Sequence, residues 1–167
     1  MIADEALARI VKATGHTGYI AMLDRTEVLG LRMRPGSKPL RVVTSPGDRL
    51  PAFCSSTGRA MLARLDDEAV RALYPAPLQP PSPNAPQTID DLLAALATVR
   101  EKGWSQATDE ILPGVESIAV CVDDRDSVLT AGPDDAGGQR AIWTWGPDCA
   151  DTHGVPSVLM LQQVGTR

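Results

Sequence analysis

The stretch FCSSTGRAML, residues 53–62, gathers a thiol and three hydroxyl side chains directly before an apolar helical run. Cys54, Ser55, Ser56 and Thr57 stand consecutively there. Such residues serve as nucleophiles, as phosphate or carboxylate ligands, or as helix caps. The first amides of a helix lack intrahelical partners, so a capping hydroxyl or a bound anion can accept their hydrogen bonds. From these residues alone, a helix cap and a ligand site both remain open.

The chain offers little that would make this stretch catalytic. A helix start can lower the pKa of a thiol such as Cys54, but only His16 and His153 could act as a neighbouring base, and both are distant in sequence. Asp109 and Glu110 are consecutive, so on a strand they point to opposite faces. The phosphate-loop pattern GxxxxGK[ST] and the zinc patterns CxxC and HxxxH are absent. We therefore predict no catalytic residues, no metal site and no cofactor.

Composition sets further bounds on the function. The chain has 167 residues, 43% of them hydrophobic and 22% charged, which is typical of one soluble globular domain. The net charge is −5 and there is no basic block, so we expect this chain alone to bind no nucleic acid. No apolar run approaches the ~20 residues of a membrane span, and MIADEALARI lacks a signal-peptide pattern. We expect a cytoplasmic protein with reduced cysteines, no membrane contact and a single domain over residues 1–167.

The first part of the chain alternates between helical and extended patterns. Residues 3–13 have the spacing of a helix that ends at Gly15. Residues 19–23 and 28–33 are short, apolar and separated by a four-residue turn, which predicts a hairpin. Residues 40–44, between prolines, form a predicted third strand.

Helical patterns dominate the middle of the chain. Thr88 and Asp91 have the spacing of a capping box, and Gly103 stops the helix that they begin. The predicted helices cover residues 57–65, 67–73 and 88–103, and a proline-rich loop covers residues 75–86.

The last part reads as further strands and one helix. Residues 104–110, 117–122 and 141–145 are predicted to be extended, with a turn at 112–114. The apolar spacing over residues 158–164, with Pro156 before it, predicts a short closing helix. Tight turns join several of the strands, so the fold class is α/β of the mixed α+β kind with antiparallel pairing.

Four motifs together resemble the C-terminal effector-binding domain of the IclR family of bacterial transcriptional regulators. They cover roughly residues 6–122 in the order of the family and read TGHTGYIAMLD, LRVVTSPGDRLPAFCSSTGRAMLARL, TIDDLLAALATVREKGWSQATDE and ILPGVESIAV. The resemblance implies a GAF-like fold, a twisted antiparallel sheet flanked by helices, with a small-molecule site over the sheet.

The resemblance also implies where the ligand lies. In the family, the turn that matches Ser55, Ser56 and Thr57 donates backbone N–H groups to a small acid, which favours the ligand site over the cap. The predicted site further includes Val42, Thr108 and Ser117, the last at a position where some members have cysteine. The first acidic position of the family segment is occupied by Ala107, so one polar anchor is lost.

The final strand of the family, A-[LI]-S-[VI]-S-G-P, has two possible counterparts here. Residues 141–147 read AIWTWGP and residues 127–133 read SVLTAGP. We prefer the first of these, in which Trp143 and Trp145 replace two serines and share one face of the strand. The two indoles then either fill the site as core residues or form an aromatic wall for the ligand. With the other register they lie outside the site.

Two classes of function follow. The first is the sensor domain of an IclR-type regulator, which binds a small effector, aromatic or carboxylate-bearing, and assembles as a homodimer or homotetramer. The second is a free-standing IclR-like domain repurposed as an enzyme or ligand-binding protein for an aromatic or hydrophobic molecule. Family members carry a winged helix-turn-helix before the effector domain, whereas this sequence starts at the first effector-domain helix. We expect either a piece of a regulator or a free-standing domain, and we prefer the sensor.

Overall fold

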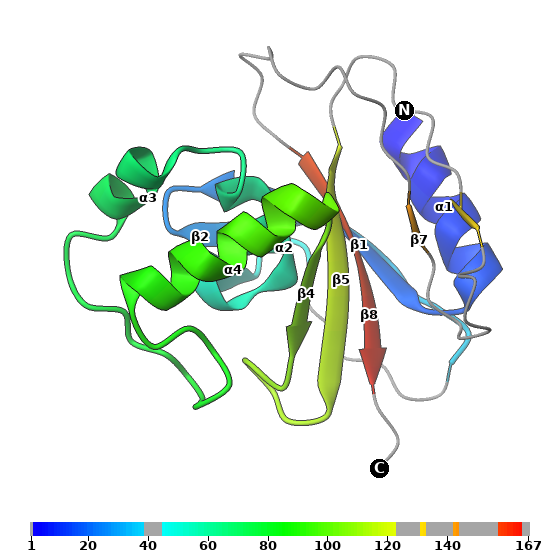
Figure 1. Ribbon diagram of the computed structural model, residues 1–167. Helices are drawn as coiled ribbons and strands as arrows, with labels where there is room; N and C mark the ends of the chain where they lie inside the picture. The colour runs from blue at the N-terminus through cyan, green and yellow to red at the C-terminus, as the bar shows by residue number, and fades with distance from the viewer. Residues whose placement is uncertain (1, 39–44, 123–130, 133–141, 144–156, 165–167) are drawn as a thin grey trace.

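A six-stranded antiparallel sheet forms the centre of the fold (Figure 1). The computed structural model describes residues 2–38, 45–122, 131–132, 142–143 and 157–164. The strands of the sheet are β1 (Thr17–Asp24), β2 (Glu27–Arg34), β3 (Arg49–Pro51), β4 (Ser105–Thr108), β5 (Val115–Val122) and β8 (Ser157–Val164). They lie in the order β3-β2-β1-β8-β5-β4. The predicted fold class, mixed helices and antiparallel strands, is confirmed.

Helices cover both faces of this sheet. The helices are α1 (Ile2–Thr14), the 3-10 turn η1 (Ala52–Cys54), α2 (Ser56–Leu62), α3 (Asp67–Leu73) and α4 (Ile89–Lys102). Figure 1 shows α1 on one side of the sheet, and α2, α3 and α4 on the other. Side chains of β1 divide accordingly, since Tyr19 and Ala21 join the core under α2 and Ile20 joins the core under α1.

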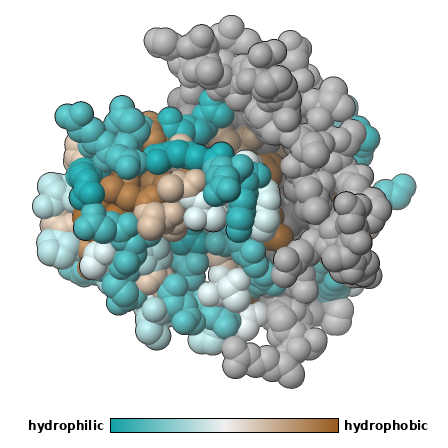
Figure 2. Space-filling view, viewed as in Figure 1, coloured by the Kyte–Doolittle hydropathy of each residue, from teal (hydrophilic) through white to brown (hydrophobic). Residues whose placement is uncertain are grey.

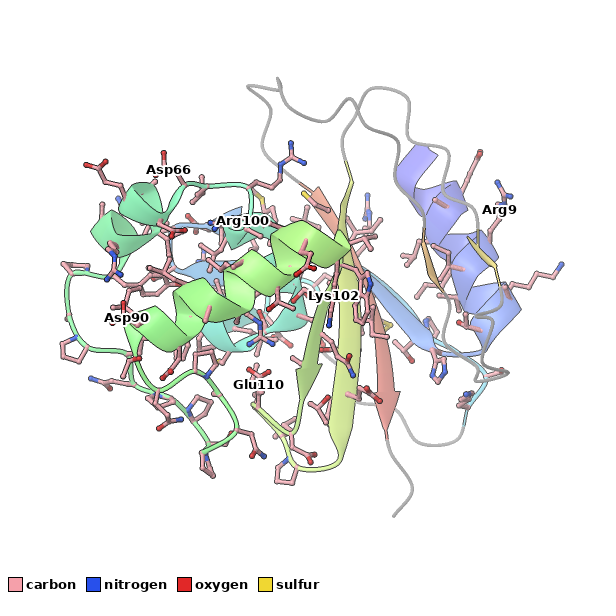
Figure 3. The ribbon with its side chains drawn as sticks, viewed as in Figure 1. Arg9, Asp66, Asp90, Arg100, Lys102 and Glu110 are labelled. Carbon is pink, nitrogen blue, oxygen red and sulfur yellow. The ribbon has the colours of Figure 1, made fainter. Side chains whose placement is uncertain are left out.

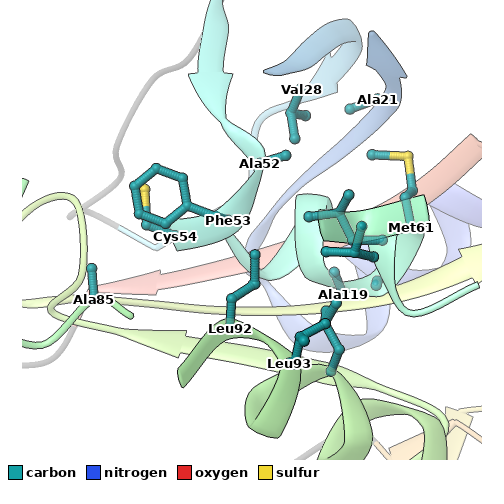
Figure 4. Packing of buried hydrophobic residues seen from close by; sticks show 14 of the residues in the cluster. Ala21, Val28, Ala52, Phe53, Cys54, Met61, Ala85, Leu92, Leu93 and Ala119 are labelled. Atoms are coloured by element: carbon teal, nitrogen blue, oxygen red, sulfur yellow. The ribbon is translucent and has the colours of Figure 1, made fainter. Parts of the chain in front are cut away.

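The larger core lies between α2, α4 and the sheet. Leu92 and Leu93 of α4 point toward Met61 of α2 and Ala119 of β5 (Figure 4). Leu92 and Met61 are almost completely buried. Burial of such side chains stabilises a fold by about 1.5–3 kcal/mol each. This packing fixes the position of α2 on the sheet.

Local sequence signals set the ends of the two longest helices. Gly15 has φ 71° and its amide donates to Val11, which closes α1. The α4 helix begins with the predicted capping box, because the Thr88 side chain accepts from the Asp91 amide and the Asp91 side chain accepts from the Thr88 amide. It ends at Gly103, whose φ of 77° is left-handed. The predicted boundaries are confirmed here.

The predicted closing helix over residues 158–164 is wrong. These residues form most of β8, which lies between β1 and β5 and pairs with β5 along its length and with β1 as far as Gln162. A short continuous apolar run fits a buried helix and a central strand equally well, and periodicity does not separate them. Pairing on both sides satisfies the backbone of the run, which favours the strand.

In the described residues, neither candidate for the final strand lies in the six-stranded sheet. The two copies of the motif contribute β6 (Ala131–Gly132) and β7 (Ile142–Trp143), which pair with each other in a separate two-stranded sheet. The position beside β5 belongs to β8 instead. The predicted strand at residues 40–44 lies outside the described residues, and β3 at Arg49–Pro51 was not predicted.

The outer surface of the α4 layer is mostly hydrophilic. Figure 2 shows hydrophilic residues along α4 and hydrophobic ones between α3 and α4. Arg100 and Asp67 join these two helices by an ion pair of 2.8 Å. Among the helices in the described ranges, none has the length and apolar character of a membrane span.

Candidate functional site

The hydroxyl cluster of the sequence lies at the junction of η1 and α2. Ser55 has extended backbone angles and is the N-cap of α2, since its Oγ accepts from the Gly58 amide at 3.0 Å. Gly58 is required here because a Cβ at this position would lie 2.2 Å from the carbonyl oxygen of Ala52. The glycine therefore allows η1 to fold against the first turn of α2. Ser55 is confirmed as a cap.

The next serine connects this junction to the sheet. Ser56 is fully buried, and its hydroxyl donates to the Ser117 hydroxyl of β5 over 2.8 Å. Ser117 pairs across the strands with Ala107 of β4. The sheet surface under Ser56 thus consists of small side chains. The structure brings together two of the predicted site residues that lie 61 positions apart.

A buried ion pair fixes the same junction and was missed by the sequence reasoning. The Arg59 guanidinium of α2 binds both carboxylate oxygens of Glu110, at 2.5 and 2.6 Å. It also donates to the carbonyls of Phe53 at 3.2 Å and of Gln106 at 2.5 Å. Glu110 lies just past the end of β4 (Figure 3). An arginine on the inward face of a helix, in the GRA motif, was the available signal.

The remaining predicted residues lie in different places. Thr57 is buried beside Ser56 in the first turn of α2. Thr108 is exposed, and strand alternation places it on the sheet face opposite Ala107 and Ser117. The structure therefore does not bring Thr108 to the 55–57 segment.

Three further predicted residues lie wholly or partly outside the described region. Val42 and Trp145 lie outside the described residues. Trp143 is described only by its backbone, as part of β7, where it pairs with Ala131. The aromatic wall formed by Trp143 and Trp145 thus remains a prediction.

The thiol in the cluster is protected from ionisation. Cys54 is fully buried, and burial, aided by the Glu110 carboxylate, raises the pKa of its thiol to about 11. Burial also raises the pKa of the nearby Tyr74 phenol, which packs edge-on against Phe53 with ring centroids 6.2 Å apart. The thiolate is the reactive form of cysteine, so Cys54 behaves as a small apolar core residue.

The arrangement combines a mutually neutralised ion pair with two buried hydroxyls. Arg59 and Glu110 neutralise each other, and the hydroxyls of Ser56 and Ser117 can donate or accept hydrogen bonds. Within the described part of the chain, no group of three His, Cys, Asp or Glu side chains could hold a metal ion. Hydroxyls of this kind can orient a small polar molecule by hydrogen bonds.

Comparison with protein families gives one match over most of the chain. Residues 1–132 match the family model described as bacterial transcriptional regulator IclR, C-terminal. The Pca regulon regulatory protein of Pseudomonas putida is 32% identical over 127 residues, which cover 75% of this chain and 44% of that protein. The chain spans about half the length of the relatives that it matches.

Solved structures show the same fold at low sequence identity. The Thermotoga maritima IclR structure has a TM-score of 0.75 at 19% identity and covers 98% of this chain and 56% of that chain. An IclR homolog from Microbacterium hydrocarbonoxydans, solved in complex with 4-hydroxybenzoate, has a TM-score of 0.73 at 20% identity. That match covers 98% of this chain and 57% of that chain.

Proposed function

This chain belongs to the family of IclR C-terminal domains, and from that premise we propose that it is the small-molecule sensor domain of an IclR-type transcriptional regulator. We propose one such domain over residues 1–167. Relatives that share the domain are named as transcriptional regulators, and the chain spans 44% of the Pca regulon regulatory protein. In this proposal the domain binds an effector, and binding changes the assembly or activity of the regulator.

The contact between Ser56 and Ser117 is the observation that carries the proposal. Their hydroxyls meet at 2.8 Å between the start of α2 and the middle of the sheet. A ligand at this point would accept hydrogen bonds from the first amides of α2, and from a serine that exchanges its partner for the ligand. We include Thr57, Val42 and the Trp143/Trp145 face in the proposed site.

The proposed ligand is a small aromatic or carboxylate-bearing molecule. The homolog from Microbacterium hydrocarbonoxydans was solved with 4-hydroxybenzoate, which has both features. The Arg59 cation is already neutralised by Glu110, so a carboxylate would be held by amides and hydroxyls rather than by a free cation. The predicted indoles would supply the apolar surface for an aromatic ring.

Calorimetric titration with a panel of aromatic acids and phenols that includes 4-hydroxybenzoate tests the site. Ser56→Ala and Ser117→Ala should each weaken binding roughly tenfold, the equivalent of one hydrogen bond of about 1.4 kcal/mol. Thr98→Ala is the matched control, because Thr98 is exposed and its hydroxyl donates to the Ala94 carbonyl within α4. Binding that is unchanged in both serine variants would contradict this site.

Indole fluorescence tests the proposed aromatic wall. Ligand-dependent quenching should disappear in Trp143→Phe/Trp145→Phe. It should survive in Trp104→Phe, because Trp104 is half-buried against the core under α1. Quenching that follows Trp104 instead would place the ligand on the α1 side of the sheet.

The proposed partners are the effector and further copies of the chain. We propose a homodimer or homotetramer, which light scattering over a range of concentrations measures. With a net charge of −5, this chain alone should bind no duplex DNA at physiological salt in a polarisation assay. A strict monomer at all concentrations would contradict the proposed homo-oligomer. Salt-sensitive binding of duplex DNA would contradict the proposal that this chain alone binds no DNA.

A further inference from the structure

We propose that Arg59, held by Glu110, is a positioning residue that keeps the 53–57 turn in the geometry that receives the effector. This inference rests on the proposed function, because it assigns a role to residues behind the proposed site. The turn comprises the end of η1, the N-cap Ser55 and the first residues of α2, including Ser56.

Arg59 joins three separate segments of the chain. Its Nη1 donates to the Phe53 carbonyl at 3.2 Å, at the start of the turn. Its Nη2 donates to the Gln106 carbonyl at 2.5 Å, next to Ala107, the cross-strand partner of Ser117. The Glu110 carboxylate holds both nitrogens. One side chain therefore sets the distance between the turn and β4–β5, across which Ser56 meets Ser117.

The Glu110 end of this contact is anchored in turn. The Ser82 hydroxyl lies 2.8 Å from the Glu110 carbonyl and 3.2 Å from the Asp109 carbonyl. Asn84 donates to the same Asp109 carbonyl at 3.3 Å. The Asp109 side chain accepts from the Gly114 amide at 2.5 Å, which closes the turn between β4 and β5. The backbone around Glu110 is thus held independently of Arg59.

The buried Arg59–Glu110 ion pair is better explained by the geometry that it imposes on the turn than by a gain in stability. Removal of two charges from water is costly, and a buried ion pair can often be replaced by apolar residues of similar volume without loss of stability. Apolar side chains, however, cannot hold two carbonyls and a carboxylate at fixed distances. The directed hydrogen bonds of a guanidinium do so.

The variant Arg59→Met/Glu110→Leu separates positioning from folding. It removes both charges together and so leaves neither one buried alone. Cys54 reports on the turn without any ligand, because it is fully buried there and its thiol reacts only when the turn opens. Labelling by a thiol reagent, followed at the Cys54 peptide by mass spectrometry, should be at least tenfold faster in the folded double variant. Labelling at the wild-type rate would overturn the proposal.

Two further variants sharpen this comparison. Arg59→Lys keeps the charge but cannot bind all the acceptors, so its labelling rate should lie between the wild type and the double variant. Arg100→Met is the matched control, since Arg100 binds the Ala63 and Leu65 carbonyls and the Asp67 carboxylate, beyond the far end of α2. It should leave Cys54 protected. If the double variant does not fold, Arg59→Lys decides the comparison, and labelling of Cys54 at the wild-type rate in that variant would overturn the proposal.

Affinity for 4-hydroxybenzoate gives the functional readout. The folded double variant should bind this probe at least tenfold more weakly than the wild type, whereas Arg100→Met should bind it normally. Equal binding by the double variant would overturn the proposal. If the wild type binds no compound of the panel, the proposed ligand fails, and the labelling of Cys54 still decides whether Arg59 positions the turn.

Discussion

Replacement of Gly58 by alanine tests how closely η1 and α2 must approach to form the proposed site. A Cβ at this position would lie 2.2 Å from the Ala52 carbonyl oxygen, 2.3 Å from its Cα and 2.6 Å from its carbonyl carbon. Ordinary contact begins at 3.4 Å, so the two segments would have to separate by about 1 Å. All three atoms belong to the backbone, so no rotation of a side chain relieves the clash.

The expected cost follows from two opposing effects. Overpacking of a buried contact costs about 1–3 kcal/mol, and the upper end applies because backbone is pressed against backbone. Alanine in a helix gains about 1 kcal/mol over glycine. The net loss in the free energy of unfolding is therefore about 2 kcal/mol. For a protein of this size that corresponds to a fall of roughly 4–8 °C in Tm.

Thermal unfolding followed by circular dichroism measures this change. The control is Gly103→Ala, where φ is positive but no atom lies within 4 Å of the added Cβ. That change should cost about 1–2 kcal/mol of backbone strain, but because Gly103 lies at the far end of α4 it should leave affinity for the effector unchanged. The Gly58→Ala protein should also lose affinity for the effector, because the Ser56 hydroxyl moves away from Ser117. A Tm at or above the wild-type value would refute the close-approach reasoning.

Two helix caps give further predictions. Ser55→Ala removes the N-cap of α2 and should lower the free energy of unfolding by about 1 kcal/mol. Ser55→Gly should lower it by only a few tenths of a kcal/mol. Chemical denaturation measures both values. Hydrogen bonds from the Thr88 hydroxyl and amide lower the pKa of the Asp91 carboxyl. The ionised carboxylate of the capping box therefore stabilises α4 fully above the ordinary aspartate pKa of about 4. This stabilisation is lost as the pH falls through the lowered pKa. Asp91→Asn should therefore flatten the acid side of a stability-against-pH curve, and Glu101→Gln, on the exposed end of the helix, should not.

The helix and turn signals in the sequence proved reliable where the interactions are local. Thr88 and Asp91 are three residues apart and meet through the backbone of one helical turn, so their types predict the cap without knowledge of the fold. Gly15 and Gly103 end their helices because glycine tolerates the positive φ that both residues adopt. This property belongs to the single residue and needs no distant partner. The four motifs within residues 6–122 likewise predicted the family and the fold class from the sequence.

Longer-range features required the tertiary structure. The run at residues 158–164 has apolar spacing that suits a helix, and it became part of β8 because strands β1 and β5 leave a place between them. Arg59 and Glu110 are 51 positions apart, and Ser56 and Ser117 are 61 apart. Each residue type is common on its own, and only packing of α2 across β4 and β5 brings the partners within hydrogen-bonding distance. Local chemistry thus determined the elements and caps, whereas the pairing of strands and buried side chains was decided by which surfaces the folded chain could bury together.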